Sequence, residues 1–266
     1  MQNSKSLKSA NFMHALQHWY ATAAGQILSN KVQNKLEQVL PSLFGYYALQ
    51  IGAMNHELDL LDSSKIGKKI YMMEDPNCGS VTASSLALPF PPDTLDLIVL
   101  PHTLDFSTDP HQVLREVHRV LISEGHIVII AFNPLSMMGL SRLAFLRSKK
   151  IPWMGHFYSS RRLKDWLKLL DFSVSHIDFV GLQPPIQNAR MQQRMQFMNK
   201  VGGVGVGRYR LGRFGGVQIL IAQKRELTLT PRPQPWLSRR PMVPVKVRES
   251  SLSHQTNHAR RSRYLH

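Results

Sequence analysis

Two short apolar runs separated by one amphipathic segment occupy residues 84–133, and they limit the fold more than any other part of the sequence. The runs are LDLIVL at 95–100 and IVIIAF at 127–132. Short apolar runs are typical of strands that are buried on both faces of a parallel sheet. Because the segment between them repeats apolar residues at helical spacing, we predict a strand–helix–strand unit with a right-handed crossover.

The predicted helix at 110–121 has defined ends. Its N-terminus can be capped by Ser107, Thr108 or Asp109. Pro110 is tolerated in the first helical turn, and Gly125 is expected to turn the chain into the second strand. The apolar face of this helix is predicted to consist of Val113, Leu114, Val117, Val120 and Leu121.

Strands and helices are predicted to alternate on both sides of this unit, which indicates an α/β fold. Before it, we predict a helical arm at 9–40, strands at 46–51, 69–73 and 80–83, and a helix at 53–66. After it, we predict helices at 135–146 and 161–170 and strands at 172–180 and 216–223. The arm is expected to bend at Gly25 and to end at Pro41. It can pack across a site or only cover the core.

Changes in composition divide the chain into three parts. They are a helical arm at 1–45, an α/β domain at 46–225 with an insertion at 182–215, and a basic tail at 226–266. The insertion contains a helix candidate at 188–200 and a glycine run at 202–207. Because this glycine run precedes a strand, it indicates a flexible loop and not a phosphate-binding loop, which would follow a strand and open a helix. The tail is rich in Pro, Ser and Arg and lacks apolar periodicity, so we expect it to be disordered in isolation.

The positive charge of the chain is concentrated near its end. The net charge is +16, from 33 Lys and Arg against 17 Asp and Glu, and residues 224–266 contribute ten Lys and Arg and two Glu. Such a balance favours polyanions, namely nucleic acid such as RNA, an anionic membrane surface or an acidic protein. The alternative is a solvated tail that binds nothing specific.

Other features of the sequence exclude several classes of protein. No apolar run approaches the roughly 20 residues of a membrane helix, and the polar N-terminal segment lacks the apolar stretch of a signal peptide. Cys78 is the single cysteine, so neither an internal disulfide nor a multi-cysteine metal site is expected. His111, His118 and His126 lie on or beside a solvated helix, and we predict no metal site. A cytoplasmic location is the expectation.

Ligands of an open α/β sheet bind beyond the carboxyl ends of its strands, so those positions hold the candidate site residues. The residues there are Gly52, Ala53, Met54, Asn55, Glu74, Asp75, Ser84, Ser85, Pro101, His102, Thr103, Asp105, Asn133 and Pro134. Gly52 allows close approach of a ligand to the backbone. Glu74 or Asp75 can accept hydrogen bonds from a ribose diol, or can serve in a turn or helix cap. His102 can act as a general base or can pack beside a ligand.

Residues 84–133 resemble one region of a known family, the class I S-adenosylmethionine-dependent methyltransferases, and are most similar to its type 11 group. The shared pattern is LPF, an acidic residue at the start of a strand, and a helix that opens with DP and ends in RVL before a glycine turn. The segments YSSRRLKDWLKLLDF and FGGVQILIAQKR are similar to the family's later part, and PSLFGYYALQIG resembles a bacterial subgroup of methyltransferase-like proteins.

This resemblance implies a Rossmann-like, seven-stranded, mostly parallel sheet of order 3-2-1-4-5-7-6, with strand 7 antiparallel and helices on both faces. It implies S-adenosyl-L-methionine as cofactor and an unidentified methyl acceptor. Carried over by position, the cofactor-binding residues are Ile51, Gly52, Ala53, Asn55, Glu74, Asp75, Ser84, Ser85, Leu86, Pro101 and His102. His102 is the candidate catalytic residue, because methyl transfer itself mainly requires alignment of the reactants.

The loop after the first strand departs from the pattern of the resembled family. That family usually has GxGxG, whereas this chain has GAMNH and retains Gly52 alone. Two hypotheses follow. One is an S-adenosylmethionine-dependent methyltransferase, and the alternative is a catalytically impaired methyltransferase-like protein that binds nucleic acid or acts as a scaffold through its basic tail. A short-chain NAD-dependent oxidoreductase is a third interpretation, but the chain lacks the glycine fingerprint of that class and its Tyr-x-x-x-Lys pair.

Overall fold

The computed structural model of this chain describes residues 12, 14–52, 54, 59–73, 80–144, 154–181 and 214–225. The chain divides into two units, 1–226 and 227–266, and every described residue lies in the first unit. The predicted helix at 188–200, the glycine run and the basic tail lie outside the described residues. Within the described part, no helix is long and apolar enough to cross a membrane.

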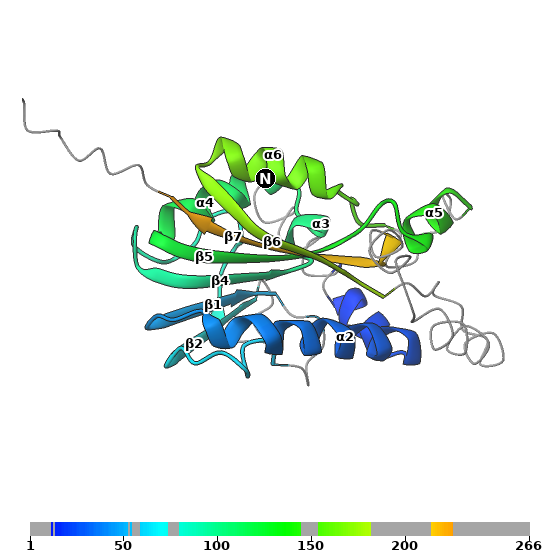
Figure 1. Ribbon diagram of the computed structural model, residues 1–266, viewed down its shortest axis with the longest axis horizontal. Helices are drawn as coiled ribbons and strands as arrows, with labels where there is room; N and C mark the ends of the chain where they lie inside the picture. The colour runs from blue at the N-terminus through cyan, green and yellow to red at the C-terminus, as the bar shows by residue number, and fades with distance from the viewer. Residues whose placement is uncertain are drawn as a thin grey trace, which may run out of the picture. The chain divides into compact units, whose positions relative to one another are not determined.

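One seven-stranded sheet forms the centre of the first unit (Figure 1). Its strands are β1 (Tyr47–Ile51), β2 (Lys68–Met73), β3 (Val81–Thr82), β4 (Leu95–Pro101), β5 (Leu121–Phe132), β6 (Phe172–Val180) and β7 (Val217–Lys224). Their order is β3-β2-β1-β4-β5-β7-β6. β7 is antiparallel to both β5 and β6, and the other neighbours are parallel. The predicted fold class and strand order are therefore confirmed.

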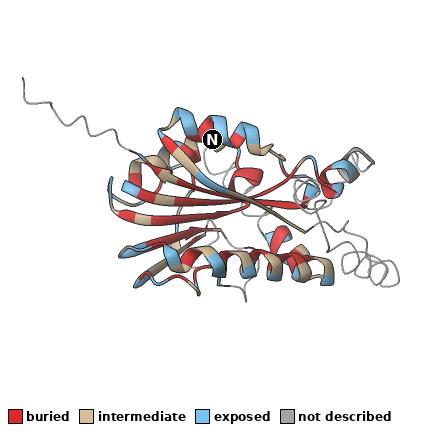
Figure 2. Ribbon diagram, viewed as in Figure 1, coloured by how far each residue is buried: buried red, intermediate tan, exposed pale blue. Residues whose placement is uncertain are grey.

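Two hydrophobic clusters form the core, one on each face of the sheet. Successive residues of β4 alternate between them, since Leu97 and Val99 belong to one cluster and Ile98 and Leu100 to the other. Helix α2 (Ala23–Val39) covers the first face, and α4 (Pro110–Val120) and α6 (Ser160–Leu169) cover the second (Figure 1). Figure 2 shows that the buried positions follow the central strands and the inner sides of these helices. The continuous apolar runs of the sequence correspond to strands that are covered on both faces.

The N-terminal arm consists of two helical stretches with a bend between them. Residues 12 and 14–20 are helical, the chain turns at Ala21 and Thr22, and α2 follows. The Thr22 side chain caps α2 by accepting a hydrogen bond from the backbone N–H of Gly25. A Cβ atom at Gly25 would lie 2.5 Å from the carbonyl oxygen of Trp19, so the bend requires glycine there. The predicted bend is confirmed, although the break itself precedes Gly25, and the 3-10 turn Leu40–Ser42 around Pro41 ends α2.

The helix predicted at 53–66 is wrong for its described part, since residues 60–63 form turns and none of residues 59–66 is helical. The Asp59 carboxylate accepts a hydrogen bond from the N–H of Leu61 at 2.8 Å, and the Ser64 hydroxyl accepts one from the N–H of Ile66. Such local side-chain bonds compete with helix formation. Leu61 and Ile66 nevertheless pack in the same cluster as α2.

The turn predicted at Gly125, in the central strand–helix–strand unit, lies one residue earlier. β5 already begins at Leu121, and the residue with a left-handed backbone is Glu124, whose φ is 64°. Gly125 is required for a different reason, because a Cβ there would lie 2.7 Å from the Leu121 side chain.

The other described elements agree with the sequence. Asp109 caps α4 by accepting a hydrogen bond from the N–H of Gln112 at 2.9 Å, and Ser159 caps α6 in the same manner. Helix α5 (Met137–Ala144) falls within the predicted 135–146. A one-turn helix that was not predicted, α3 (Thr103–Phe106), follows β4 directly.

Candidate active site

His102 lies at the carboxyl end of β4 and is held there by the backbone. It has a left-handed conformation with φ of 55°, it precedes the first residue of α3, and it is fully buried. Its N–H donates to the carbonyl oxygen of Ile130 at 2.8 Å. The next residue, Thr103, donates from its hydroxyl to the carbonyl oxygen of Ile51 at 2.6 Å, which ties the end of β4 to the end of β1. A left-handed backbone at a non-glycine residue is typical of functional sites.

A continuous hydrogen-bonded chain runs from the N-terminal arm through His102 to Asp105. The Tyr20 hydroxyl oxygen is 2.6 Å from Nε2 of His102, and Nδ1 of His102 is 2.8 Å from Oδ2 of Asp105. The same carboxylate oxygen accepts the N–H of Phe132 at 2.9 Å. Since the carboxylate can only accept, we assign the ring proton to Nδ1 and the lone pair to Nε2, which accepts the phenolic proton of Tyr20.

Burial changes the acidity of both ends of this chain. It raises the pKa of Tyr20 well above its ordinary value of 10, with a further contribution from the charge of Asp105. Burial also raises the pKa of Asp105, while the hydrogen bond from His102 opposes that rise. Tyr20 therefore stays protonated at neutral pH and acts as the donor to His102.

Aromatic rings surround the imidazole of His102. Phe132 stacks on it with ring centroids 4.0 Å apart, and Phe157 stacks on the far side of Phe132 at 5.1 Å. Trp19 packs edge-on against both Phe132 and Tyr20. In such apolar surroundings a hydrogen bond is stronger than in water, and an unpaired polar atom is costly.

The candidate residues after β1 lie close to this chain. Ile51 is buried, and Gly52 has φ of 88° and donates its N–H to the carbonyl oxygen of Met72 at 2.8 Å. The carbonyl oxygen of Gly52 accepts the side-chain amide of Gln50 at 2.9 Å. Met54, which replaces a usual glycine of the resembled family, is fully buried in the cluster that α2 covers.

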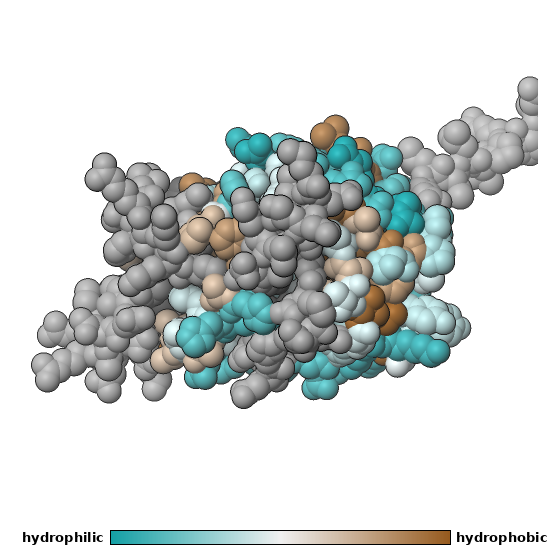
Figure 3. Space-filling view, turned by 180° about the vertical axis from the view of Figure 1, so that it is seen from behind, coloured by the Kyte–Doolittle hydropathy of each residue, from teal (hydrophilic) through white to brown (hydrophobic). Residues whose placement is uncertain are grey.

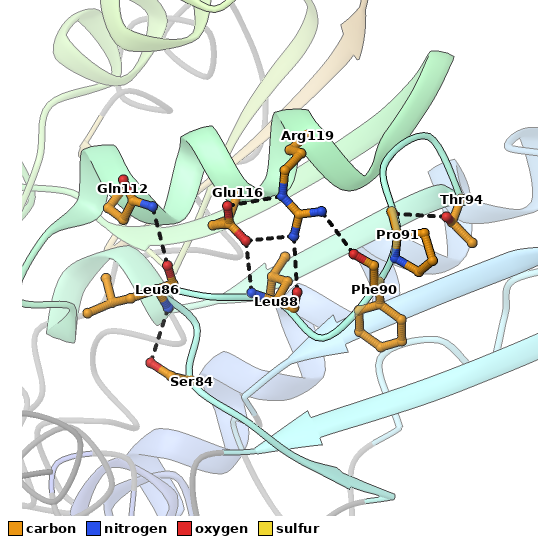
Figure 4. A network of polar contacts seen from close by, with 9 residues as sticks. All are labelled: Ser84, Leu86, Leu88, Phe90, Pro91, Thr94, Gln112, Glu116 and Arg119. Atoms are coloured by element: carbon orange, nitrogen blue, oxygen red, sulfur yellow. Dashed lines mark hydrogen bonds and ion pairs between the residues drawn. The ribbon is translucent and has the colours of Figure 1, made fainter. Parts of the chain in front are cut away.

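The segment that contains Ser84, Ser85 and Leu86 is fixed to α4 by two charged side chains (Figure 4). Glu116 accepts the N–H of Leu88 at 2.9 Å, and Arg119 donates to the carbonyl oxygens of Leu88 and Phe90 at 3.0 and 2.9 Å.

The two side chains that hold this segment also bind each other, since Arg119 and Glu116 form an ion pair at 2.7 Å. Gln112, on the same helix, donates to the carbonyl oxygen of Leu86 at 3.4 Å. Within the segment, the Ser84 hydroxyl accepts the N–H of Leu86 at 3.3 Å, while Ser85 is buried. Side chains of α4 therefore hold the segment 84–90, which leads into β4, in a defined position.

The structure thus brings several sequence-predicted residues to one edge of the sheet. Ile51, Gly52, Pro101 and His102 lie at the ends of β1 and β4, and residues 84–86 precede β4. Ala53, Asn55, Glu74 and Asp75 lie outside the described residues. No three His, Cys, Asp or Glu side chains of the described part come together as a metal site.

Sequence reasoning missed Tyr20, because 82 positions separate it from His102 and it formed part of an ordinary apolar stripe. Asp105 carried a weak signal. It lies three residues after His102, the spacing that places two side chains on one face of a helical turn.

Three buried oxygens near this edge have no hydrogen-bond partner. They are Oε1 of Gln17, Oε1 of Gln50 and Oδ1 of Asp105. All three are acceptors, and the amide of Gln17 lies 4.0 Å from the sulfur of Met73, at the end of β2. Unpaired buried acceptors complement a ligand that carries several donors. S-adenosylmethionine has an ammonium group, ribose hydroxyls and an adenine amino group, so the described residues fit this cofactor.

Comparison with protein families gives one match. Residues 44–129 match the family model of a methyltransferase domain of type 11. The chain is 29% identical over 225 residues to the uncharacterized protein YafS of Escherichia coli (strain K12), covering 85% of this chain and 88% of YafS. It is also 36% identical over 76 residues to the ubiquinone/menaquinone biosynthesis C-methyltransferase UbiE of Ruegeria sp. (strain TM1040), covering 28% of this chain and 30% of UbiE.

Solved structures share the fold at low sequence identity. A SAM-dependent methyltransferase of Thermotoga maritima superposes with a TM-score of 0.54 and 15% identity, covering 81% of this chain and 98% of that one. A SAM-dependent methyltransferase of Archaeoglobus fulgidus gives a TM-score of 0.50 and 20% identity, covering 74% and 94%. Together with the sheet order, these similarities show that the described unit has the fold of S-adenosylmethionine-dependent methyltransferases, and that residues 44–129 are similar to a methyltransferase domain.

Proposed function

We propose that this chain transfers the methyl group of S-adenosylmethionine to an acceptor at the carboxyl edge of the sheet. The observation that carries this proposal is the arrangement of Gly52, the segment 84–86 and His102 around one edge of a methyltransferase domain. The unpaired acceptor oxygen of Gln50 lies at the same edge. Ligands of open α/β sheets bind at this edge.

Each part of the cofactor has candidate partners in this chain. Gly52 lets the backbone approach the ligand, and the segment 84–86, held by Arg119 and Glu116, would contact the nucleoside. Glu74 or Asp75 would accept hydrogen bonds from the ribose, as the family resemblance implies. When bound, the cofactor supplies an electrophilic methyl group on a sulfonium.

The chemical contribution of the protein is alignment and proton acceptance. His102 carries a lone pair on Nε2, and Asp105 orients the ring and would stabilise its protonated form. The aromatic residues around His102 exclude water, so the acceptor would be held in a fixed orientation. We assign His102 as the proton acceptor and Asp105 as its positioning residue.

Calorimetric titration of the full-length chain with S-adenosylhomocysteine tests this proposal. We expect saturable binding and a raised melting temperature, and we expect no response to NADH, which an oxidoreductase would bind. Neither heat nor a thermal shift at millimolar S-adenosylhomocysteine would contradict the proposal.

A second proposed activity concerns the tail at 226–266. Residues 226–266 contribute six of the sixteen net positive charges, from eight Lys and Arg and two Glu. We propose that this segment binds RNA or another polyanion, alongside catalysis or in place of it. Binding of single-stranded RNA is expected to weaken steeply with salt and to fall on deletion of the tail. Salt-independent binding, or equal binding by the truncated chain, would refute it.

A further inference from the structure

We propose that the methyl acceptor is a phenol-type molecule whose hydroxyl takes the place of the Tyr20 hydroxyl on Nε2 of His102. This inference rests on the proposed methyltransferase function and names its substrate class. The N-terminal helical stretch at 12–20 is then a segment that the acceptor displaces.

The imidazole of His102 has a single lone pair in the plane of its ring. Nδ1 of His102 donates its proton to Asp105 at 2.8 Å. Nε2 is therefore the acceptor nitrogen, and it can accept a hydrogen bond from only one donor. In the structure that donor is the phenol of Tyr20, at 2.6 Å. An acceptor hydroxyl that is to lose its proton to His102 must therefore compete with Tyr20 for the same atom.

The described residues of the helical stretch at 12–20 are joined to the sheet domain by both polar and apolar contacts. These contacts include the Tyr20–His102 bond, a long contact from Gln17 to the sulfur of Met73 at 4.0 Å, and the packing of Leu16 in the cluster on the first sheet face. The remaining oxygen of Gln17 is buried without a partner, as is one oxygen of Asp105. Such orphaned atoms cost free energy in the closed arrangement, which lowers the cost of opening it.

The bend at Ala21 and Thr22 separates this stretch from α2. α2 has its own cap at Thr22 and its own buried residues, among them Leu28, Val32 and Leu36. Displacing the described residues of 12–20 therefore withdraws Leu16 and Tyr20 from the cluster on the first sheet face but leaves α2 in that cluster. The described hinge is short, as expected for a segment that moves as a unit.

The space that the Tyr20 ring fills is lined by aromatic groups of the sheet domain. The ring lies 5.6 Å from the imidazole of His102. Phe132 stacks on the imidazole beside it. These surroundings favour an aromatic ring with one polar end, since aromatic pairs prefer such offset and edge-to-face contacts.

The proton step of this proposal is balanced within the chain. The O–H bond of the acceptor breaks, its proton moves to Nε2 of His102, and the electron pair stays on the acceptor oxygen, which becomes the nucleophile. The imidazolium that forms is paired with the carboxylate of Asp105. Release of that proton to solvent after reaction restores the starting state.

The test uses 4-ethylphenol as the probe and ethylbenzene as its matched control, on the full-length chain. Hydrogen exchange of the backbone amides at 14–20 is expected to accelerate at least tenfold with 4-ethylphenol, while the amides of α2 stay unchanged. Ethylbenzene is expected to have no effect because it offers no proton donor. Equal effects of the two compounds, or none from either, would overturn the proposal.

Tyr20→Phe removes the internal competitor and keeps the ring. This variant is expected to bind 4-ethylphenol about tenfold more tightly than the unaltered chain, the equivalent of one hydrogen bond of 1.4 kcal/mol. Tyr71→Phe removes a phenol oxygen that is bonded to Asp59, away from His102, and is expected to leave the affinity for 4-ethylphenol unchanged. If Tyr20→Phe does not tighten binding, the proposal is wrong.

S-adenosylhomocysteine binding, measured on the same samples, separates the two proposals. Binding of that ligand with no response to 4-ethylphenol would overturn the acceptor assignment and leave the methyltransferase function standing. Loss of both would overturn the proposed function itself.

Discussion

The phenol of Tyr20 and the imidazole of His102 meet in the core at 2.6 Å, although 82 positions separate them in the sequence. Both side chains are fully buried, and Asp105 on the far side of the imidazole extends the contact into a three-residue chain. This bond links the N-terminal arm to the carboxyl end of β4. The arm is therefore part of the candidate site and more than a cover for the core.

Tyr20→Phe is expected to lower the free energy of unfolding by about 1–3 kcal/mol, because it leaves Nε2 of His102 buried without a donor. Denaturant titration measures this change. Tyr71→Phe removes the same atom from a bond of 2.7 Å to Asp59 in a more exposed place and should cost about 0.5–1 kcal/mol. A smaller loss for Tyr20→Phe than for Tyr71→Phe would contradict the importance of the buried bond.

Gly25→Ala should destabilise the protein by about 1–3 kcal/mol, because its Cβ would lie 2.5 Å from backbone atoms of Trp19 and Tyr20. The bend between the two helical stretches must then open. Gly67→Ala is the matched control, since nothing lies within 4 Å of a Cβ there, and its melting temperature should be unchanged or slightly higher. Thermal unfolding of both variants checks the prediction, which fails if they behave alike.

Arg119→Lys should weaken S-adenosylhomocysteine binding about tenfold while the fold is retained. The lysine keeps the charge but loses the planar group that reaches the carbonyl oxygens of Leu88 and Phe90 and the Glu116 carboxylate together. The segment 84–90 then becomes mobile. Arg115→Lys, on the same helix and bonded only to Gln112 among the contacts described, is the control. Equal affinities in calorimetry would show that Arg119 does not position the segment.

The pH dependence of stability should show the contribution of Glu116. The hydrogen bond from Arg119 lowers the pKa of Glu116 below its ordinary value of 4.5, so its ionised form stabilises the folded state. This contribution is complete above pH 4.5 and is lost as the pH falls through the lowered value. Glu116→Gln should therefore cost about 1 kcal/mol at pH 7 and much less at pH 3.

Glu37→Gln provides the control for that pH series, because Glu37 is exposed on α2. Urea unfolding of both variants and of the unaltered chain, at several pH values, gives the comparison. A loss for Glu116→Gln that does not depend on pH would exclude ionisation as its cause.

The central unit of the fold was predictable because its signals are local. The apolar runs of β4 and β5, the Asp109 cap and Pro110 all act within a few residues of one another. The helix expected at 53–66 failed in its described part, where side-chain bonds of Asp59 and Ser64 hold turns and Leu60, Leu61 and Ile66 still pack in the same cluster as α2. That packing joins segments that are distant in the sequence, and no local pattern contains it.

The sequence by itself determined the α/β class, the central strands and the strand ends at which a ligand would bind, since hydrophobic periodicity specifies buried strands and helices. The strand order and the type of domain came from the resemblance of residues 84–133 to the methyltransferase family. Only the tertiary structure decided what His102 contacts. Its partners are Asp105, three residues away, and Tyr20, from an arm whose apolar stripe carried no sign of a polar role. Burial converts that phenol into a proton donor with a raised pKa, and burial is a property of the folded chain.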